Sequence, residues 1–402
     1  MTRFRQMTRE TLLVNRLAPL GVLLACLLVS ACVTTKSRSA YSVDELVAAA
    51  INDKYDIRFF PRKNPDYMVA LGWQDGTDAL PVAEDGTFDI LALSGGGPDG
   101  AYGAGALKGM EKVGSKPHYE IVTGVSTGAL LAPFVFAGPD FDDFPSNIYT
   151  SDLFARVLGK PNYAAALGGP SLYSDRSIPP FLNRYISMPL IRKIAEEHAK
   201  GRRLLIATSN LDARDLTVWN MGLIATRAAE ANDQGSLELF RKVVRAAFSI
   251  PGALPPVEFV ADFGGKKFTE LHGDAGVQAY FYGGPELVPA NWRKKRNSPS
   301  TAGLDVILHN QIEVMAEPVE AKALELATTS VSSLTRTSMR LLLDNRIRDC
   351  DDAGMRMRYT YLPREWQTVS AMDFNTAYMR KTYRLGEERA TSGTLWEQGR
   401  RK

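Results

Sequence analysis

Apolar and polar positions follow one another along the middle of the chain in blocks that predict strands and helices in turn. The apolar run Phe88–Leu93 predicts a buried strand, and the run Tyr119–Thr123 predicts a second one. Between them a glycine-rich loop at 94–100 leads into a helical stretch, Ala101–Val113. Strand and helix patterns continue to alternate over residues 87–311, so we expect an α/β core.

The two ends of the chain predict additions to this core. Residues 41–86 are expected to form a small N-terminal cap, and residues 312–402 an extension that packs on the core and covers the sheet or shapes a groove. No linker sets either part off from the core at 87–311, so we expect one domain. The elements expected in these parts are a helix at Val43–Ile51 capped by Ser42, a long helix Val319–Leu343, a strand Met355–Leu362 and a closing helix near Phe374–Arg389.

Ser126 lies at the centre of a Gly-x-Ser-x-Gly pentapeptide, between Gly124 and Gly128. The apolar run before it and the apolar stretch Ala129–Ala132 after it predict a strand, a sharp turn and a helix, which is the setting of a nucleophilic serine. The alternative is a glycine-rich turn in which the serine caps the helix. The pentapeptide alone does not decide between them.

The glycine loop before the helix contains Gly95, Gly96 and Gly97. A parallel crossover returns both strand ends to the same edge of the sheet, so we expect this loop beside Ser126. Backbone N–H groups next to a nucleophilic serine form an oxyanion hole. The loop also fits Gly-x-Gly-x-x-Gly through Gly100, but a dinucleotide site needs an acidic residue after the second strand, where this chain has the Ser126 pentapeptide.

Asp274 lies between small residues, in Gly273-Asp274-Ala275-Gly276, after the run Phe268–Leu271. This suits a strand end at which a carboxylate comes close to another group. The alternative is an Asx turn, a common use of aspartate beside glycine.

These segments resemble, in order, the blocks of the patatin-like phospholipases. The blocks are the glycine loop, the Ser126 pentapeptide, Asn210-Leu211-Asp212, the segment Arg245–Val257 and the Asp274 motif. The resemblance implies a three-layer sandwich with a mostly parallel central sheet. It also implies a lipid acyl hydrolase without cofactor or metal, in which Ser126 attacks an ester and Asp274 accepts its proton, with no histidine between them. The substrate would be a phospholipid, a lysophospholipid or another lipid ester.

The chain departs from that pattern in two places. The family usually has Lys or Arg one residue before the last glycine of the loop, and this chain has Asp99. A carboxylate pointing inward there would oppose the negative charge of an oxyanion, so we expect Asp99 to face solvent or a local partner. The second departure is Ala275, which replaces a glycine and is still small.

A histidine relay is the alternative mechanism. The order Ser126, Asp274, His309 would match a Ser-His-Asp carboxylesterase, and His272 lies on the same face as Asp274 if the segment is a strand. His118 and His198 fall at the far end of a strand and in a Lys/Glu-rich helix that looks exposed. Another alternative is a lipoprotein that uses the same fold for binding or assembly, but it should have lost Ser126 or Asp274, and this chain keeps both.

The N-terminus resembles a bacterial lipoprotein signal. Residues 1–31 have a basic start and an apolar stretch, Leu17–Ala31, too short to span a bilayer comfortably. The stretch ends in Leu28-Val29-Ser30-Ala31-Cys32, which implies cleavage before Cys32, acylation of its thiol, and a tether over 32–40. We expect a lipid-anchored protein of the cell envelope, facing the periplasm from the outer membrane where the host has one. An uncleaved anchor is the alternative.

Removal of the expected signal changes the charge and cysteine counts. Without residues 1–31 the chain has 44 basic and 44 acidic residues, so no nucleic-acid partner is implied. The local cluster Arg293–Arg296 is expected in a solvated loop, with anionic lipid headgroups as the alternative contact. Cys350 is the only cysteine after Cys32, so no intramolecular disulfide is expected, and the core must stabilise the fold.

Overall fold

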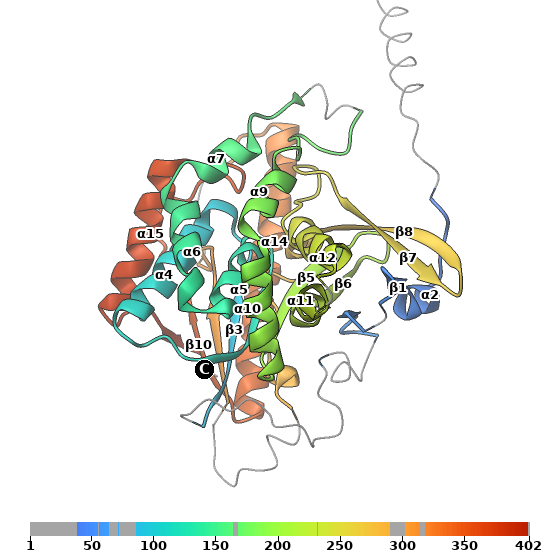
Figure 1. Ribbon diagram of the computed structural model, residues 1–402. Coiled ribbons are helices and arrows are strands. Elements are labelled where there is room, and N and C mark those ends of the chain that lie inside the picture. The colour runs from blue at the N-terminus through green and yellow to red at the C-terminus, as the bar shows by residue number, and fades with distance from the viewer. Residues whose placement is uncertain are drawn as a thin grey trace, which may run out of the picture.

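The computed structural model shows a three-layer α/β sandwich (Figure 1). It describes residues 38–54, 56–63, 71, 86–163, 168–230, 232–289, 302–313 and 318–400. The expected signal, Cys32 and the Arg293–Arg296 cluster lie outside the described residues.

One sheet forms the middle layer, and within the described residues it has eleven strands. Five neighbouring strands at its centre run parallel, in the order β5, β4, β3, β9, β10. Strands β3, β4 and β5 are buried along their whole length, as parallel strands covered on both faces should be. The predicted α/β fold with helices flanking a central sheet is therefore confirmed, but the described sheet is mixed rather than mostly parallel, since only these five strands run parallel. The bounds are β3 Phe88–Leu93, β4 Tyr119–Gly124, β5 Arg203–Asn210, β9 Ala302–Ile307 and β10 Arg356–Thr360.

Antiparallel strands extend the sheet on both sides. On one side β8 pairs with β5, β7 with β8 and β1 with β7, while β6 pairs with β5 and β2 with β6. On the other side β11 pairs with β10. The parallel order does not reach these flanks because β5–β6 and β7–β8 are hairpins, and a hairpin makes an antiparallel pair. The bounds are β1 Ala50–Ile51, β2 Arg58–Phe59, β6 Asp215–Asn220, β7 Val257–Phe263, β8 Lys266–Asp274 and β11 Glu397–Gln398.

Most helices cover one face of the sheet, and α14 covers the other (Figure 1). Strand β3 shows why, because Leu91 and Leu93 point into the core under the first group of helices, whereas Ile90 and Ala92 point to the core that α14 covers. The first group is α4 Gly100–Lys112, α5 Thr127–Ala137, α6 Asp143–Thr150, α9 Ile178–Tyr185, α10 Met188–Ala199, α11 Met221–Glu230, α12 Gln234–Ala247 and α15 Thr376–Thr391; α14 is Ala323–Asp352. The short helices are α2 Val43–Ala48, α7 Leu153–Leu158 and the 3₁₀ turns η1 Gly97–Asp99, η2 Pro139–Phe141, η3 Ala275–Val277 and η4 Pro285–Leu287.

The N-terminal segment joins the sheet through β1 and β2. Ser42 caps α2 as predicted, because its hydroxyl accepts from the backbone of Glu45 and the Glu45 side chain accepts from Ser42 in return. The helix ends at Ala48, earlier than the predicted Ile51, because Ala50–Ile51 pairs with β7 instead.

In the C-terminal segment the predicted strand and closing helix exist as β10 and α15. The predicted long helix was wrong at both ends, since α14 begins at Ala323 and continues to Asp352. Residues 344–352 are strongly charged, but Met339, Leu343 and Cys350 are buried in the core that α14 covers, so the helix keeps an inner face there.

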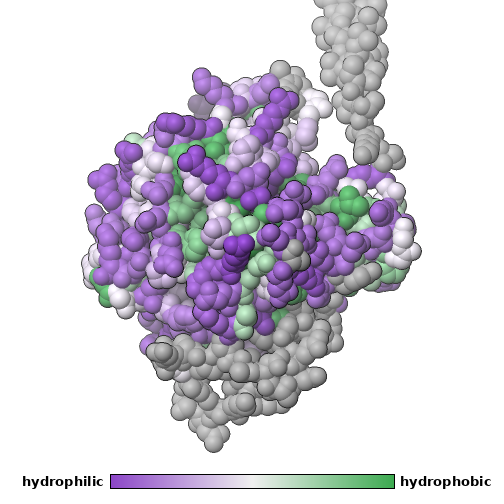
Figure 2. All heavy atoms as spheres, in the orientation of Figure 1, coloured by the Kyte–Doolittle hydropathy of each residue, from purple (hydrophilic) through white to green (hydrophobic). Residues whose placement is uncertain are grey.

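The face shown in Figure 2 is mostly polar, with apolar side chains gathered over α6 and between α7 and α9. Helix α7 is one wall of the pocket described below.

Candidate active site

Ser126 and Asp274 meet because two strands share one edge of β5. Strand β4 pairs with the first half of β5, ending at Gly124 opposite Ile206. Strand β8 pairs with the second half of β5, ending at Asp274 opposite Thr208. Since β4 is parallel to β5 and β8 is antiparallel, their carboxyl ends face each other across a short gap. Ser126, two residues beyond β4, lies in that gap.

The turn that carries Ser126 is strained. Its backbone has φ 53° and ψ −123°, a conformation that costs a non-glycine residue of the order of 1–3 kcal/mol. Side chains would not fit at the flanking glycines, because a Cβ at Gly128 would overlap the carbonyl of Leu93, and one at Gly124 would overlap Ala129. The turn therefore points one small polar side chain above the sheet, as the pentapeptide predicts.

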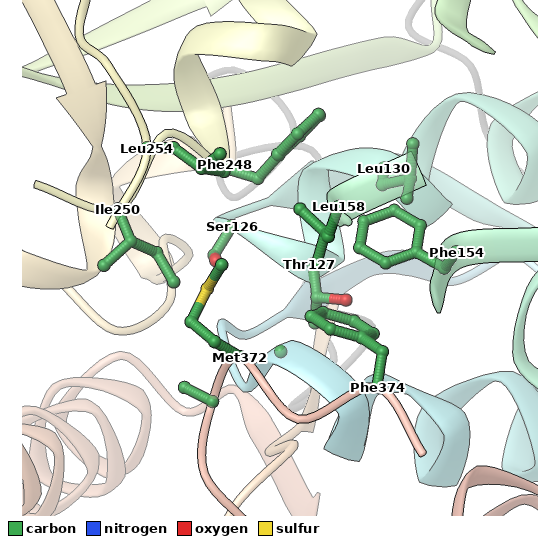
Figure 3. Close-up of a pocket in the computed structure, with 12 residues that line it drawn as sticks. Ser126, Thr127, Leu130, Phe154, Leu158, Phe248, Ile250, Leu254, Met372 and Phe374 are labelled. Carbon is green, nitrogen blue, oxygen red and sulfur yellow. The ribbon is translucent and has the colours of Figure 1, made fainter. Parts of the chain in front are cut away.

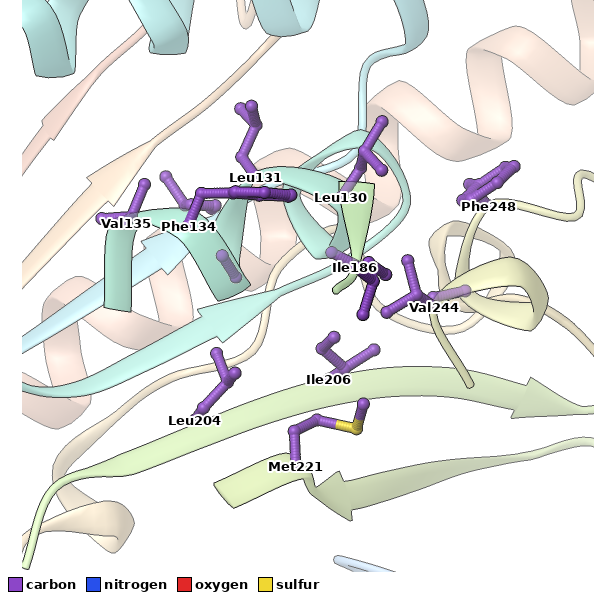
Figure 4. Close-up of a cluster of buried hydrophobic side chains, with 14 of the residues drawn as sticks. Leu130, Leu131, Phe134, Val135, Ile186, Leu204, Ile206, Met221, Val244 and Phe248 are labelled. Carbon is purple, nitrogen blue, oxygen red and sulfur yellow. The ribbon is translucent and has the colours of Figure 1, made fainter. Parts of the chain in front are cut away.

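Helix α5 holds this turn from below. All eleven of its residues are buried, and Leu130, Leu131 and Phe134 belong to one hydrophobic cluster with side chains of β5, α11 and α12 (Figure 4). The N-terminus of α5 points at the Ser126 turn and carries a partial positive charge. Within the described chain, the Ser126 side chain makes no capping hydrogen bond to α5, so the capping alternative is wrong.

The Ser126 hydroxyl instead donates to Asp274, with 2.5 Å between Oγ and Oδ2. The other carboxylate oxygen of Asp274 accepts from the backbone N–H of Gly276 at 2.7 Å, which is the Asx turn that the sequence also allowed. The two interpretations of Asp274 are thus compatible, one for each oxygen. The backbone N–H of Asp274 donates to the carbonyl of Ser249 at 2.9 Å, so the segment after α12 fixes the position of Asp274.

Burial raises the pKa of Asp274 to about 6, while the hydrogen bonds from Ser126 and Gly276 act in the opposite direction. A carboxylate that has lost its water is a stronger base than one in solution. At neutral pH Asp274 is ionised and has the geometry to take the proton of Ser126.

The glycine loop lies beside the serine, as predicted. A Cβ on Gly95 would lie 3.1 Å from Cβ of Ser126, and Gly128 N–H donates to the Ser94 carbonyl at 3.2 Å. Gly97 has φ 58°, and any side chain there would overlap the carbonyl of Ala371. Only glycine therefore fits at position 97 of the loop.

The three loop glycines are not equivalent. The N–H of Gly95 donates to the carbonyl of Tyr280 at 3.0 Å. Within the described part of the chain, the N–H groups of Gly96 and Gly97 donate no hydrogen bond. The expectation that all three serve an oxyanion is therefore corrected for Gly95, whose donor is engaged, and Gly96 and Gly97 remain available.

A narrow apolar pocket opens at Ser126 (Figure 3). About 350 Å³ of space lies between its walls, open solvent at the mouth included. Its walls come from α7, from the segment after α12 and from residues 371–374 of the C-terminal extension. The apolar side chains that line it are Leu130, Phe154, Leu158, Phe248, Ile250, Leu254, Ala371, Met372 and Phe374.

Asp99 is buried at the end of η1 and has a local partner, as expected. The hydroxyl of Tyr378 in α15 donates to its carboxylate. Burial raises the pKa of Asp99 to about 7, and the hydrogen bond from Tyr378 limits that rise.

The histidines are occupied elsewhere. Nδ1 of His309 lies 2.7 Å from the carbonyl of Ser94, and His272 lies 2.9 Å from Thr208 and 3.0 Å from Glu270. Within the part of the chain that the structure describes, no histidine contacts Ser126 or the Asp274 carboxylate through a hydrogen bond. His118 lies just before β4 as expected, whereas His198 is half-buried against Gly222, because its helix α10 turns that face inward. The triad arrangement is therefore absent from the described residues.

Sequence reasoning expected the C-terminal extension to cover the sheet or shape a groove, and residues 371–374 do line the pocket, but it did not identify the residues that form the walls or support the loop. Phe154, Phe374 and Tyr378 reach the site from segments with no motif of their own. The segment Arg245–Val257 was noticed as a motif, and its roles in lining the pocket and holding Asp274 become visible only in the fold. Among the described residues, no group of His, Cys, Asp or Glu side chains is arranged to hold a metal ion.

Part of the chain matches a known protein family. Residues 91–279 match the family model described as Patatin-like phospholipase. Among solved structures, VipD from Legionella pneumophila is similar at 12% identity and a TM-score of 0.36, over 79% of this chain and 70% of its own. The type III effector protein ExoU is similar at 14% identity and a TM-score of 0.22, over 79% of this chain and 55% of its own. No curated protein matches the chain. The segment 91–279 is therefore a patatin-like phospholipase domain.

Proposed function

We propose that this protein hydrolyses ester bonds of membrane lipids with a Ser126–Asp274 dyad. The observation that supports this most directly is the 2.5 Å hydrogen bond from Ser126 Oγ to a buried carboxylate at the mouth of an apolar pocket. Acyl transfer requires a serine with a general base, amide donors for the oxyanion and a place for the acyl chain. Here the amide donors are the N–H groups of Gly96 and Gly97, which donate no hydrogen bond to any described residue.

In the first half of the reaction, Oγ of Ser126 attacks the ester carbonyl carbon while its proton passes to Oδ2 of Asp274. The carbonyl oxygen becomes an oxyanion, and the N–H groups of Gly96 and Gly97 and the N-terminus of α5 stabilise its charge. The proton then moves from Asp274 to the alcohol oxygen as the carbon–oxygen bond breaks. The products are a free alcohol and an acyl-serine.

In the second half, a water molecule attacks the acyl-serine and gives its proton to Asp274. The tetrahedral intermediate collapses, Ser126 recovers a proton from Asp274 and the fatty acid leaves. Asp274 serves both steps because burial holds its pKa near 6. At this pKa the carboxylate can accept a proton in one step and give it up in the next.

The pocket favours an acyl chain over a polar substrate. Its lining is aliphatic and aromatic, and Phe154 packs on Phe374 with ring centroids 4.4 Å apart. A carbon chain in this pocket gains about 0.8 kcal/mol for each CH₂ removed from water, which supports lipid esters as the substrate class. We propose phospholipid or lysophospholipid as the substrate on this basis.

We further propose that an acylated Cys32 anchors the protein to a membrane of the cell envelope. Support comes from the lipoprotein-like N-terminus and from Arg38, which pairs with Asp212 through two hydrogen bonds of 2.6 and 2.7 Å. Asp212 follows the carboxyl end of β5, the same edge of the sheet as Ser126, so the tether would leave the domain on the side of the site. The described residues include no helix with the length and apolarity needed to cross a membrane.

The nucleophile is tested with a fluorophosphonate probe and p-nitrophenyl esters of increasing chain length. Wild-type protein should be labelled and should hydrolyse the esters, and Ser126→Ala should lose both properties. Ser330→Ala, which changes an exposed serine of α14, is the matched control and should behave as wild type. Labelling or full hydrolysis in Ser126→Ala would contradict the assignment.

The anchor is tested separately with Cys32→Ser. The variant should remain an uncleaved precursor, and its mass should show no acyl groups. A mature, unmodified protein cut at another residue would point to an ordinary secretory signal.

A further inference from the structure

Asp99 is an acidic side chain built into the turn that carries the free loop amides. It is the last residue of η1, which begins at Gly97, and only 4% of its surface is exposed. Nothing in the dyad mechanism uses this carboxyl group. A buried acid in such a place costs free energy unless it is paired or neutral.

The C-terminal extension holds the loop at two points. The carbonyl of Ala371 lies directly against Gly97, and the hydroxyl of Tyr378 donates to Asp99. Tyr378 is itself fixed in the first turn of α15, because its N–H donates to the capping side chain of Asn375 at 3.0 Å. The position of η1 therefore depends on this extension.

No cation balances Asp99 among the residues that the structure describes. The titratable groups that face it are Tyr378 of α15, Tyr149 of α6 and Tyr280 beyond η3. His309 packs on Gly96, but burial lowers its pKa to about 4, so it is neutral.

The charge of Asp99 would be felt on both sides of the serine. The hydroxyl of Tyr149 is hydrogen-bonded to Thr127, the residue after Ser126. Besides burial, the Asp99 charge contributes to raising the pKa of Tyr149, and the charges of Asp99 and Asp274 both contribute to raising that of Tyr280. The two carboxyl groups thus border the same site.

We propose that Asp99 is a positioning residue that holds the oxyanion loop as a neutral carboxylic acid through Tyr378, and that its ionisation turns hydrolysis off. This inference rests on the proposed function. An ionised Asp99 would place a negative charge in the turn that must receive a second negative charge on the substrate oxygen, and a buried site screens the two poorly. In the neutral form, Asp99 can still accept from Tyr378, and the opposing charge is gone.

The ionisation of Asp274 and of Asp99 should then limit hydrolysis to a narrow pH range. Asp274 must be ionised, and its pKa is about 6; Asp99 must be protonated, and its pKa is about 7. The value of kcat/KM, which reports the free enzyme, should rise through the first pKa and fall through the second. A hydrolase limited by its general base alone would stay active at alkaline pH.

The test measures kcat/KM on a soluble short-chain ester from pH 5 to 9 for wild type, Asp99→Asn and Tyr378→Phe. In wild type, kcat/KM at pH 8.5 should be about one tenth of its value at pH 6. Asp99→Asn keeps the shape and cannot ionise, so the ratio of its two kcat/KM values should stay near one or above. Asp142→Asn is the matched control, since it changes a buried aspartate paired with Lys116 away from the loop, and should keep the wild-type profile.

Tyr378→Phe keeps the proposal testable if Asp99→Asn does not fold. Loss of a hydrogen bond that favours the charged form should move the alkaline limb to higher pH, with a smaller kcat because the loop is less firmly held. The proposal would be overturned if kcat/KM of the wild type did not fall at alkaline pH. It would also be overturned if either variant showed the same alkaline fall as the wild type. Absence of any ester hydrolysis by wild type would instead count against the proposed function.

Discussion

Strand β8 carries two buried carboxyl groups on one face, Glu270 and Asp274, and their surroundings differ sharply. Glu270 receives two hydrogen bonds from Arg58, at 2.7 and 2.9 Å, and one from Asn210 at 3.0 Å. Although burial acts in the opposite direction, Arg58 and His272 lower the pKa of Glu270 to about 2. Asp274 has a serine hydroxyl and one backbone N–H for partners, and its pKa is raised to about 6.

The difference teaches what makes a buried carboxylate useful as a base. Both side chains are withdrawn from water on the same strand, so burial alone does not distinguish them. A guanidinium fixes the charge on Glu270 and joins β2 to β8, which is a structural role. Asp274 lacks such a partner among the described residues, and therefore keeps a proton affinity that a serine can use.

The largest effect is expected from Asp274→Asn. The amide cannot accept the serine proton, so kcat should fall by about 10³-fold or more. The same change should raise the melting temperature by a few degrees at pH 7, because a raised pKa means that the ionised aspartate destabilises the folded state, by up to about 3 kcal/mol. This gain in stability should appear as the pH rises above about 4, the pKa of an aspartate in the unfolded chain. It should level off above about pH 6, the pKa of folded Asp274. Retained activity would show that Asp274 is as structural as Glu270.

Removing the cation beside Glu270 should destabilise the protein without removing the base. Arg58→Met leaves a buried charge unpaired, and should cost about 3–5 kcal/mol in the free energy of unfolding at pH 7.5. In wild type, the lowered pKa of Glu270 stabilises the folded state. This contribution is complete above about pH 4.3, the pKa of a glutamate in the unfolded chain, and is lost as the pH falls to about 2, the pKa of folded Glu270. In the variant, Glu270 can take a proton, so the deficit should shrink at pH 4.5.

The double variant Arg58→Met/Glu270→Gln is the control for this prediction. It should recover much of the loss, because no unpaired charge remains. Denaturant unfolding at both pH values measures these effects. An equal deficit at pH 4.5 and 7.5 would mean that packing, rather than charge, is what Arg58 contributes.

The acid side of the pH profile compares the two carboxylates directly. Below pH 6, kcat/KM should fall about tenfold for each pH unit, as Asp274 becomes protonated. Glu270→Gln should leave the midpoint of this limb unchanged, since Glu270 titrates near 2. A flat wild-type profile between pH 5 and 6 would mean that the base ionises at an ordinary carboxyl pKa.

The smallest effects are expected at the histidines. His309→Ala and His272→Ala should keep kcat within about tenfold, with any loss due to packing, whereas a general base contributes roughly 10²–10⁴-fold. Circular dichroism and probe labelling establish that each variant is folded. A thousandfold loss of kcat in a folded, probe-labelled His309→Ala variant would show that His309 takes part in catalysis.

Local sequence could predict the centre of the fold because its signals are short-range. The runs at Phe88–Leu93 and Tyr119–Thr123, with the Ser126 pentapeptide, contain their strand, turn and helix within adjacent residues. The juxtaposition of Ser126 and the glycine loop followed from the handedness of one crossover. The Asp274 motif was found by its small neighbours, although its approach through an antiparallel strand was not.

The rest depends on contacts that no local pattern records. Gly95, Gly96 and Gly97 look alike in sequence, and only the carbonyl of Tyr280 sets Gly95 apart. The pocket wall at residues 371–374 has no motif, because an apolar wall needs only side chains of suitable size in the right place. Helix α14 continues through a charged stretch because buried positions such as Cys350 anchor it.

The supports of the site come from opposite ends of the chain, and this affects when the site can form. Arg58 and Glu270 are 212 residues apart, and Asp99 and Tyr378 are 279 apart. Pairings this distant form slowly, and they cannot form until the late segments have been synthesised. The turn that carries Ser126 therefore lacks the support of its loop until the C-terminal extension has been synthesised and folded.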